Sequence, residues 1–420
     1  MHLDTHGYSP AVLKKIVIAG GRQPSFALAA EMLKELAEIT ISAPHVRRIT
    51  EQIGAELLQG RDARTRGMAA RTLTPRVANV PAVAVVEVDG GRLQIRASDQ
   101  GRGVHEPAWK EDKIGCLVTM QSTVQERDPH PELPACFADP PRVAALVRGV
   151  SSQGALSAME GVTAAAAAEP TPEGEADAPR ASSPWQPKPL VRTCVATTQA
   201  SDDFGPMVAA EAEMRNFSAA GRQAFVGDGQ AWNWTLQKAY FPGSTAITDF
   251  IHVLTYVYLA AKSIAGSAQE HWKIYLGWAT SCWQGRVAEV IAELKAWGER
   301  VGPIAPGEDP PASDPRRVIS KTLTYLENNQ ARMEYARYRR LGLPVTSSLV
   351  ESLIKQFNYR VKGTEKFWDV GGAESILQVR AALLSEDERL AKHMETRDCL
   401  PFRRYQCRRE GQAARLRKAG

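Results

Sequence analysis

The amino-acid sequence predicts an α/β protein in which a sheet domain is interrupted by an all-helical segment. Residues 81–120 contain apolar, β-branched runs without a helical period, which is typical of buried strands. Residues 190–249 alternate between strand and helix patterns, and residues 252–342 have helical spacing apart from a proline-rich loop at 302–315. A hydrophobic content of 44% and a charged content of 24% are ordinary for folded proteins, so they exclude a chain that is disordered throughout.

Length, charge and cysteine usage narrow the class of protein. A chain of 420 residues is long enough for two or three domains. Its 52 basic and 47 acidic side chains leave a formal charge of +5, which by itself does not indicate nucleic acid. None of the six cysteines belongs to a C-x-x-C pair, which favours reduced thiols over a zinc knuckle or a disulfide framework. The N-terminus has no apolar signal core, and the apolar stretch at 250–261 is too short to span a bilayer. We therefore expect a cytoplasmic protein and exclude secreted and membrane proteins.

The first 78 residues are predicted to be helical. One short helix covers residues 10–19, Ser25 caps a second, and Ser42 opens a third with apolar residues at helical spacing. Two helices joined by a short turn, with Arg47 and Arg48 early in the second, resemble a helix-turn-helix, and a plain helical hairpin fits the same pattern. We assign residues 1–78 to a helical DNA-binding region.

Residues 79–150 are predicted to contain three strands. The run 81–89 reads as a buried strand that ends in a turn at Asp89-Gly90, residues 92–97 as its hairpin partner, and residues 113–120 as the third strand. Residues 151–189 are rich in alanine, proline and acidic side chains, which predicts a flexible linker.

The second half of the core is predicted to alternate between strands and helices over residues 190–252. A strand ends at Asp228-Gly229, a helix follows, and a short strand at 246–249 leads into a long helix near His252. We expect a helical insertion at 253–343, a helix bearing Glu351 that closes the core within 344–385, and a basic tail at 386–420. Three antiparallel strands followed by α/β alternation is the order of a ribonuclease-H-like fold.

Three carboxylates in this pattern point to metal chemistry. Asp89 and Asp228 each end an apolar strand, and either one alone is equally explained as a turn residue. Together with Glu351 on a helix, they could hold two Mg²⁺ ions about 3.5–4 Å apart for phosphodiester chemistry. Asp249 and His252 begin the next helix, where Asp249 is either an N-cap or, with His252, a support for the metal site.

Two long segments carry ordered motifs: GDGQAWNWTLQKAYFPGSTAITDFIHVLTYVYLAA and YLENNQARMEYARYRRLGLPVTSSLVESLIKQFNYRVKGTEKFW. In these motifs the chain resembles bacterial insertion-sequence transposases of the ISKra type, which are relatives of the Mutator-like DDE transposases, and the resemblance runs from the GYSP block to about Arg380. It implies that Asp89, Asp228 and Glu351 are the catalytic metal ligands. The D-x-x-H signature falls on Asp249 and His252, which makes Asp228 rather than Asp249 the second ligand.

The resemblance also implies the reaction and the partners. Such enzymes bind the terminal repeats of a mobile element, cut with a metal-activated water and join the freed 3′-hydroxyl to target DNA. The implied cofactors are two Mg²⁺ or Mn²⁺ ions. The implied partners are element-end and target DNA and further copies of the chain, without a membrane or a small-molecule substrate, in a nucleoid-associated location.

Two departures from the family pattern support an alternative. Pro344-Val-Thr-Ser-Ser348 replaces a glycine-containing turn, whose loss would displace Glu351 if the turn needed a positive φ, and the chain starts almost on the first family block. The alternative is a truncated, degenerate transposase that only binds DNA. A housekeeping ribonuclease-H-like nuclease would explain the carboxylates but not the D-x-x-H signature.

Basic residues cluster on both sides of Glu351. Such clusters are ordinarily solvated surface, but beside a metal site they favour phosphate contacts. Trp232, Trp234 and Trp368 could stack on a flipped base, although core packing explains them better. The predicted DNA-contacting residues are Arg47, Arg48, Arg339, Arg340, Lys355, Arg360 and Lys362.

Overall fold

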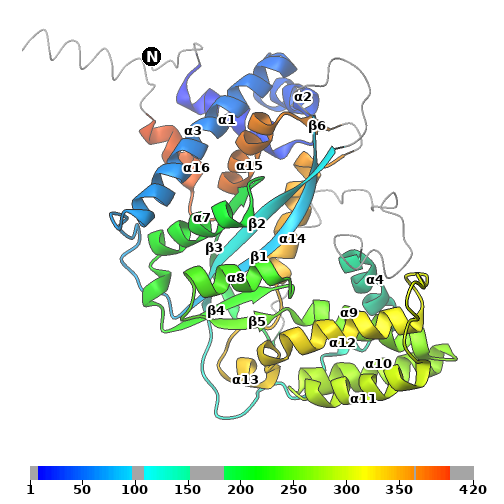
Figure 1. Cartoon of the computed structure of the whole chain (residues 1–420). Helices are drawn as coiled ribbons and strands as arrows, with labels where there is room; N and C mark the ends of the chain where they lie inside the picture. Colours follow the sequence, from blue (N-terminus) through cyan, green and yellow to red (C-terminus); the bar gives the residue numbers. More distant parts are fainter. Residues whose placement is uncertain (1–7, 97–107, 152–183, 364–365, 398–420) are drawn as a thin grey trace, which may run out of the picture.

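The sheet is mixed and lies at the centre of the molecule (Figure 1). The computed structural model describes residues 8–96, 108–151, 184–363 and 366–397. Strand order is β3-β2-β1-β4-β5, and a short β6 pairs with the far end of β1. The first three strands are antiparallel, whereas β4 and β5 run parallel to β1. The α/β class is therefore confirmed. The strands are β1 (Val83–Ile95), β2 (Ala108–Gln121), β3 (Lys188–Thr197), β4 (Arg222–Gly227), β5 (Thr245–Thr248) and β6 (Phe367–Trp368).

The predicted turn at Asp89-Gly90 is wrong, because β1 continues straight through it. Gly90 is paired with Lys113 and Gly91 with Asp112 in an unbroken antiparallel ladder with β2. A Cβ atom on Gly91 would lie 2.9 Å from Oδ1 of Asp112, so the glycine allows this close cross-strand approach. Residues 79–150 consequently hold two strands within their described part. The third antiparallel strand is β3, which follows the predicted linker, and residues 152–183 of that linker lie outside the described residues.

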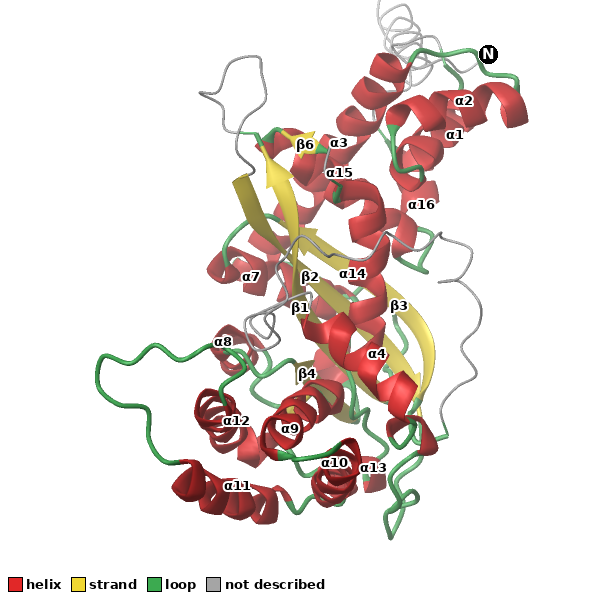
Figure 2. Cartoon of the chain, turned by 90° about the vertical axis from the view of Figure 1, so that its right-hand side faces the viewer, coloured by secondary structure: helices red, strands yellow, loops and turns green. Residues whose placement is uncertain are grey.

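Helices cover both faces of the sheet (Figure 2). Alternate β1 residues divide between two cores: Ala84, Val86 and Val88 pack with α7 and α8, whereas Val83 and Val85 pack into the larger core on the other face. On that second face α14 packs against β1 and β2, and α15 against β3. The helices named here are α7 (Ser201–Met214), α8 (Ala231–Tyr240), α14 (Ser348–Val361) and α15 (Val370–Leu384).

The prediction of helices over residues 253–343 is confirmed in substance. Figure 1 shows these helices gathered at one end of the sheet. Aromatic side chains fill their core, with the Trp283 ring 4.9 Å from that of Phe250 and 6.2 Å from that of Phe137. They are α9 (Phe250–Ile264), α10 (Ala268–Trp283), α11 (Val287–Val301), α12 (Pro315–Asn329) and α13 (Tyr335–Arg340), with α4 (Pro140–Ser151) beside α9 and single 3₁₀ turns at Ala135–Phe137, Phe217–Ala219 and Gln330–Arg332.

The N-terminal helices form a separate core with the last two described helices. Helices α1 (Pro10–Arg22), α2 (Phe26–Ala37) and α3 (Ala43–Ala69) confirm the predicted helical region, and the Ser25 hydroxyl accepts from the Leu28 N–H as the predicted cap. They pack with α15 and α16 (Arg389–Thr396). The basic tail beyond residue 397 lies outside the described residues. Among the described residues, no helix combines the length and apolar character needed to cross a membrane.

The contact between α3 and α16 gives the fold a pH dependence. Burial alone would raise the pKa of Glu56, but hydrogen bonds from His393 and Arg397 outweigh it and lower that pKa to about 2. Because the folded pKa lies below the ordinary value of 4.5, this stabilisation is complete above about pH 4.5 and is lost as the pH falls toward 2. We expect Glu56→Gln to cost about 1–3 kcal/mol at pH 7 in urea unfolding, with the difference from the wild-type chain shrinking below pH 4.5. A pH-independent difference would contradict this account.

Candidate active site

An open cleft of about 2000 Å³ lies where β1 and β4 meet the start of α14. Its floor is acidic, and all three carboxylates that the sequence singled out line it. Asp89, Asp228 and Glu351 come from positions more than a hundred residues apart, so only the sheet topology brings them together. His252 and a further carboxylate, Glu87, line the same floor.

Asp89 points from β1 toward the face that α14 covers. One of its oxygens accepts from the Gly90 N–H at 2.7 Å. Burial raises the pKa of Asp89 well above its usual range, and the charge of Asp228 raises it further, against smaller opposing effects from His252 and the Gly90 N–H. The negative charge of Asp228 thus disfavours the ionised form of Asp89.

The turn after β4 fixes the direction of the Asp228 carboxylate. It accepts from the Gln230 N–H at 3.0 Å, from the Gln230 side chain at 2.6 Å and from the buried Asn233 amide at 2.5 Å. Gly229 has a φ of +98°, a conformation that strains any residue with a Cβ atom. The Asp-Gly pair is therefore a turn, as its residue types predict, and it also places a carboxylate in the cleft.

Glu87 anchors the helix that carries Glu351. Its carboxyl group is buried and accepts from the Val350 N–H at 2.9 Å, which satisfies one of the free N–H groups at the start of α14. Burial raises the pKa of Glu87 to about 8, and the charges of Asp249 and Glu351 add to the shift. Glu87 is not among the residues predicted from the sequence. The available signal was a lone glutamate in an apolar strand, two positions before Asp89 and so on the same face.

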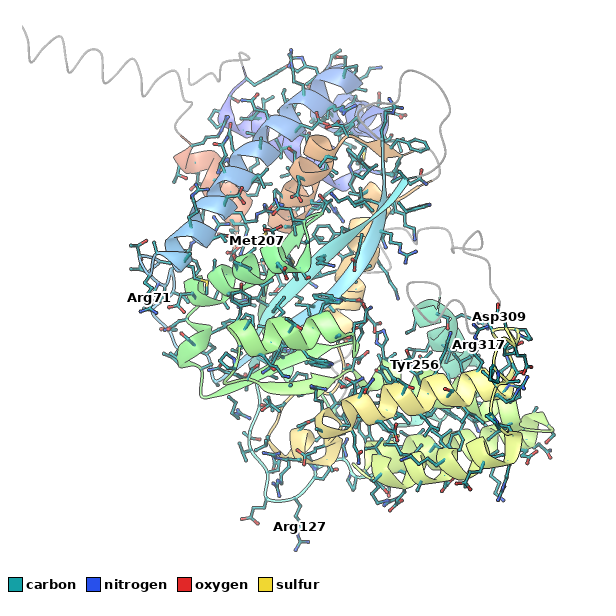
Figure 3. The ribbon with its side chains drawn as sticks, viewed as in Figure 1. Arg71, Arg127, Met207, Tyr256, Asp309 and Arg317 are labelled. Carbon is teal, nitrogen blue, oxygen red and sulfur yellow. The ribbon has the colours of Figure 1, made fainter. Side chains whose placement is uncertain are left out.

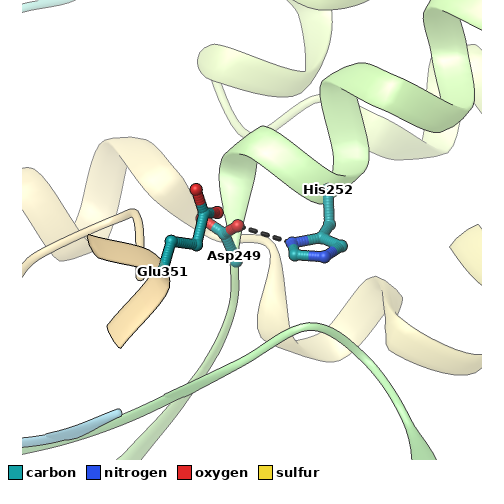
Figure 4. Close-up of side chains that lie close together, drawn as sticks. All are labelled: Asp249, His252 and Glu351. Atoms are coloured by element: carbon teal, nitrogen blue, oxygen red, sulfur yellow. Dashed lines mark hydrogen bonds and ion pairs between the residues drawn. The ribbon is translucent and has the colours of Figure 1, made fainter. Parts of the chain in front are cut away.

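Asp249 and His252 form a buried ion pair beside Glu351 (Figure 4). Asp249 accepts from the Ile251 N–H at 3.3 Å, the Ser347 N–H at 3.0 Å and His252 Nδ1 at 2.7 Å, so the N-cap prediction is confirmed. Burial lowers the pKa of His252, but the bond to Asp249 and the charges of Asp228 and Glu351 outweigh burial and raise it to about 10. One ligand atom each from Asp249, His252 and Glu351 lie within 4.8 Å of one another.

Within that close group, Asp249 is the poorest candidate for metal binding. Its side chain has no exposed surface, and three protein donors already occupy its oxygens. The raised pKa of His252 favours its protonated form, which places a positive charge beside the carboxylates. The carboxylates that line the cleft are those of Glu87, Asp89, Glu111, Asp228 and Glu351, and Asp249 is not among them.

The turn before α14 does not need the glycine that it lacks. No residue from 343 to 348, all of which the structure describes, has a positive φ, and the left-handed position nearby is Gly342. The Gln186 amide donates to the Thr346 hydroxyl, and Ser347 is held by Asp249. The turn before Glu351 is therefore formed without a residue of positive φ between positions 343 and 348.

Two of the predicted DNA contacts are wrong, because the arginines are buried. Arg339 binds Asp128 and the Trp283 carbonyl, and its guanidinium lies 3.8 Å from the centre of the Trp283 ring. Arg360 lies between the rings of Phe26 and Trp368 and donates to the Gly20 carbonyl, and burial lowers its pKa to about 9. A count of basic residues cannot separate such cations from exposed ones.

The other predicted contacts vary in accessibility. Lys355 is exposed on the cleft wall, one helical turn after Glu351, and Arg340 is exposed on α13. Arg47 forms ion pairs with Glu51 and Asp369. Arg48 lies 3.1 Å from the His45 ring, and Lys362 lies 5.8 Å from the centre of the Trp109 ring.

Basic side chains that the sequence analysis did not single out line the cleft. They come from β1, α4, β3, α8 and α12, and no sequence periodicity connects them. The predicted tryptophans serve packing: Trp234 is buried and donates to Asn329, and Trp368 is buried and donates to the Val361 carbonyl. The added cleft cations are Arg92, Arg142, Arg192, Lys238 and Lys321.

Comparison with known proteins leaves this site to be interpreted from its geometry. No protein-family model matches the sequence, and no curated protein shows significant similarity to it.

Proposed function

We propose that the chain is a DDE-type transposase that binds insertion-sequence ends and target DNA and catalyses metal-dependent cleavage and strand transfer. The observation that carries this proposal is the meeting of Asp89, Asp228 and Glu351 on the floor of one large cleft with cationic walls. Three convergent carboxylates are the ligand set that two-metal phosphodiester chemistry needs.

The sheet order supports a ribonuclease-H-like core. Three antiparallel strands, with β4 and β5 added parallel to β1 on its other side, give the order β3-β2-β1-β4-β5. The helices from α9 to α13 enter between β5 and α14, which is where the sequence motifs predict an insertion. The carboxylates lie along β1, at the end of β4 and in the first turn of α14, as that architecture requires.

The donor set fits divalent cations. Mg²⁺ and Mn²⁺ prefer carboxylate oxygens, and a cation held by these residues would favour the ionised form of Asp89, which burial and the charge of Asp228 disfavour. When bound, the ions would activate water or a 3′-hydroxyl and stabilise the charge that develops on the phosphate. Asp89, Asp228 and Glu351 would hold them. His252 supplies fixed positive charge behind Glu351, and Lys355 is placed to contact a phosphate at the cleft wall.

The walls of the cleft suit a nucleic-acid backbone. Lys238 on α8 and Lys321 on α12 line one wall together with Thr235 and Thr324, which can donate to phosphate oxygens. Lys355 and Gln356 line the wall formed by α14. A small substrate would not need a cleft of this volume lined by cations from several elements.

Loss of two wall lysines should weaken DNA binding in a salt-dependent way. We expect the double variant Lys238→Gln, Lys321→Gln to bind a labelled duplex of about 30 base pairs roughly tenfold more weakly at low salt, with the slope of log Kd against log salt reduced by about 2. Fluorescence anisotropy measures both quantities. Lys295→Gln is the matched control, because Lys295 pairs with Glu327 away from the cleft. An unchanged slope in the double variant would remove these lysines from the interface.

A strand-transfer assay separates the proposed function from its alternatives. With element-end DNA and Mg²⁺, joined products indicate a transposase, whereas cleavage without joining indicates a nuclease. Binding without cleavage indicates the degenerate, DNA-binding form. The turn at 344–348 has no residue of positive φ, so the missing glycine does not by itself favour that alternative.

A further inference from the structure

Three tyrosines extend from the helical segment to backbone carbonyl groups of the sheet. The Tyr325 hydroxyl donates to the Asp228 carbonyl at 2.9 Å, that of Tyr335 to the Thr248 carbonyl at 2.8 Å, and that of Tyr338 to the Ala246 carbonyl at 3.4 Å. The last two satisfy alternate carbonyls of β5, the edge strand of the sheet. The first reaches the turn that presents a candidate metal ligand.

Helix α12 holds that turn at more than one point. The Asn329 amide donates to the Gly229 carbonyl at 3.4 Å, while its oxygen accepts from Trp234 at 2.9 Å. The Tyr325 ring lies so close to Gly229 that a Cβ atom there would be 2.6 Å from it. Tyr325 is itself stacked on Tyr256, with ring centres 3.8 Å apart and an angle of 13° between the planes. Tyr256, labelled in Figure 3, lines the cleft from α9.

The turn is therefore held from two directions. Gln230 and Asn233 bind the Asp228 side chain from within the sheet domain, and Tyr325 binds the peptide carbonyl from the helical segment. The side-chain bonds hold the carboxylate relative to the start of α8, and the pairing of Gly227 with Thr248 holds the backbone before Asp228. The hydroxyl of Tyr325 supplies a further constraint, on the Asp228 carbonyl.

We propose that Tyr325 is a positioning residue for metal binding, through which the helical segment holds the Asp228 carboxylate in place. This inference rests on the proposed metal site. Groups that orient a ligand without touching the metal commonly change metal affinity by about 10- to 100-fold when they are removed. The helical segment is then part of the metal site as well as a wall of the cleft.

Tyr325→Phe tests this with little change in packing, because only the hydroxyl is removed. In Mn²⁺ titrations of the full chain by isothermal calorimetry, we expect about tenfold weaker binding, with metal-free thermal unfolding close to that of the wild-type chain. Tyr275→Phe is the matched control. It removes another hydroxyl of the helical segment that donates to a backbone carbonyl at 3.0 Å, that of Phe137, and it should leave Mn²⁺ affinity unchanged.

Asn329→Ala removes the other hydrogen bond from α12 to this turn, that of the Asn329 amide to the Gly229 carbonyl. Like Tyr325→Phe, it should weaken Mn²⁺ binding. Affinities within twofold of wild type in both variants, in a chain where Asp228→Asn loses Mn²⁺, would overturn the positioning role and leave the metal site intact. If Asp228→Asn itself binds Mn²⁺ as the wild type does, the proposed metal site fails instead. A loss of affinity shared equally by Tyr275→Phe would also overturn the role, because it would reflect general loosening of the helical segment.

Discussion

Asp228→Asn should lower metal-dependent cleavage and joining of element-end DNA by about a thousandfold or more, while leaving end-DNA binding intact. Asp228 is the cleft-facing carboxylate whose charge acts most strongly on Asp89. Asparagine keeps the shape of the side chain but removes the charge that would share a cation with Asp89. A thousandfold loss corresponds to about 4 kcal/mol, which is within what a bound metal contributes to phosphoryl transfer.

The same substitution should leave the fold nearly as stable as before. It removes charge repulsion against Asp89, and the remaining oxygen can still accept from the Gln230 N–H or the Asn233 amide. Gel analysis of end-labelled DNA gives the activity, and thermal unfolding gives the control. Full activity in Asp228→Asn together with loss of activity in Asp249→Asn would show that Asp249 is the second ligand.

Local sequence patterns predict most elements of this fold because their periods are clear. Ser25 caps α2 as predicted, and the helical segment follows its apolar spacing. The turn at Asp89-Gly90 fails as a prediction because turn propensity is local, whereas thirteen paired positions with β2 decide the path of β1. The third antiparallel strand is likewise set by a partner that lies far along the chain.

The candidate site likewise contains some residues that the sequence predicts and others that only the fold brings together. Asp89, Asp228 and Glu351, the proposed metal ligands, are singled out in the sequence because each lies in a recognisable motif, and the structure places all three in the lining of one cleft. Glu87 is not found, because its role depends on the start of a helix more than 250 residues away. Lys238 and Lys321 are not found, because they come from α8 and α12, which no sequence pattern assigns to one cleft. The burial of Arg339 and Arg360 depends on Trp283, Trp368 and Phe26, which are aromatic partners that no charge pattern reveals.

Asp249→Ala should destabilise the protein by about 3–5 kcal/mol, in contrast to Asp228→Asn. Asp249 is fully buried and accepts from two backbone N–H groups and from His252, so its loss leaves three donors without their acceptor, one of them charged. The Ser347 N–H is among them, so the start of α14 and Glu351 lose an anchor. Urea unfolding followed by circular dichroism measures the cost, and the slope of the transition should stay constant.

Asp249→Asn separates the two roles that Asp249 could have. Asparagine retains an oxygen for the Ser347 N–H but cannot form an ion pair with His252, so we expect an intermediate loss of stability. If Asp249 positions α14 and His252, activity should fall as the start of α14 becomes less ordered. Mn²⁺ binding should then survive in the folded fraction of the protein. If Asp249 is a ligand, Mn²⁺ binding should vanish while the fold remains. Loss of Mn²⁺ binding in Asp228→Asn, with binding retained in Asp249→Asn, would assign metal binding to Asp228 and a structural role to Asp249. Their positions agree with this division, because Asp228 lines the cleft and Asp249 is fully buried.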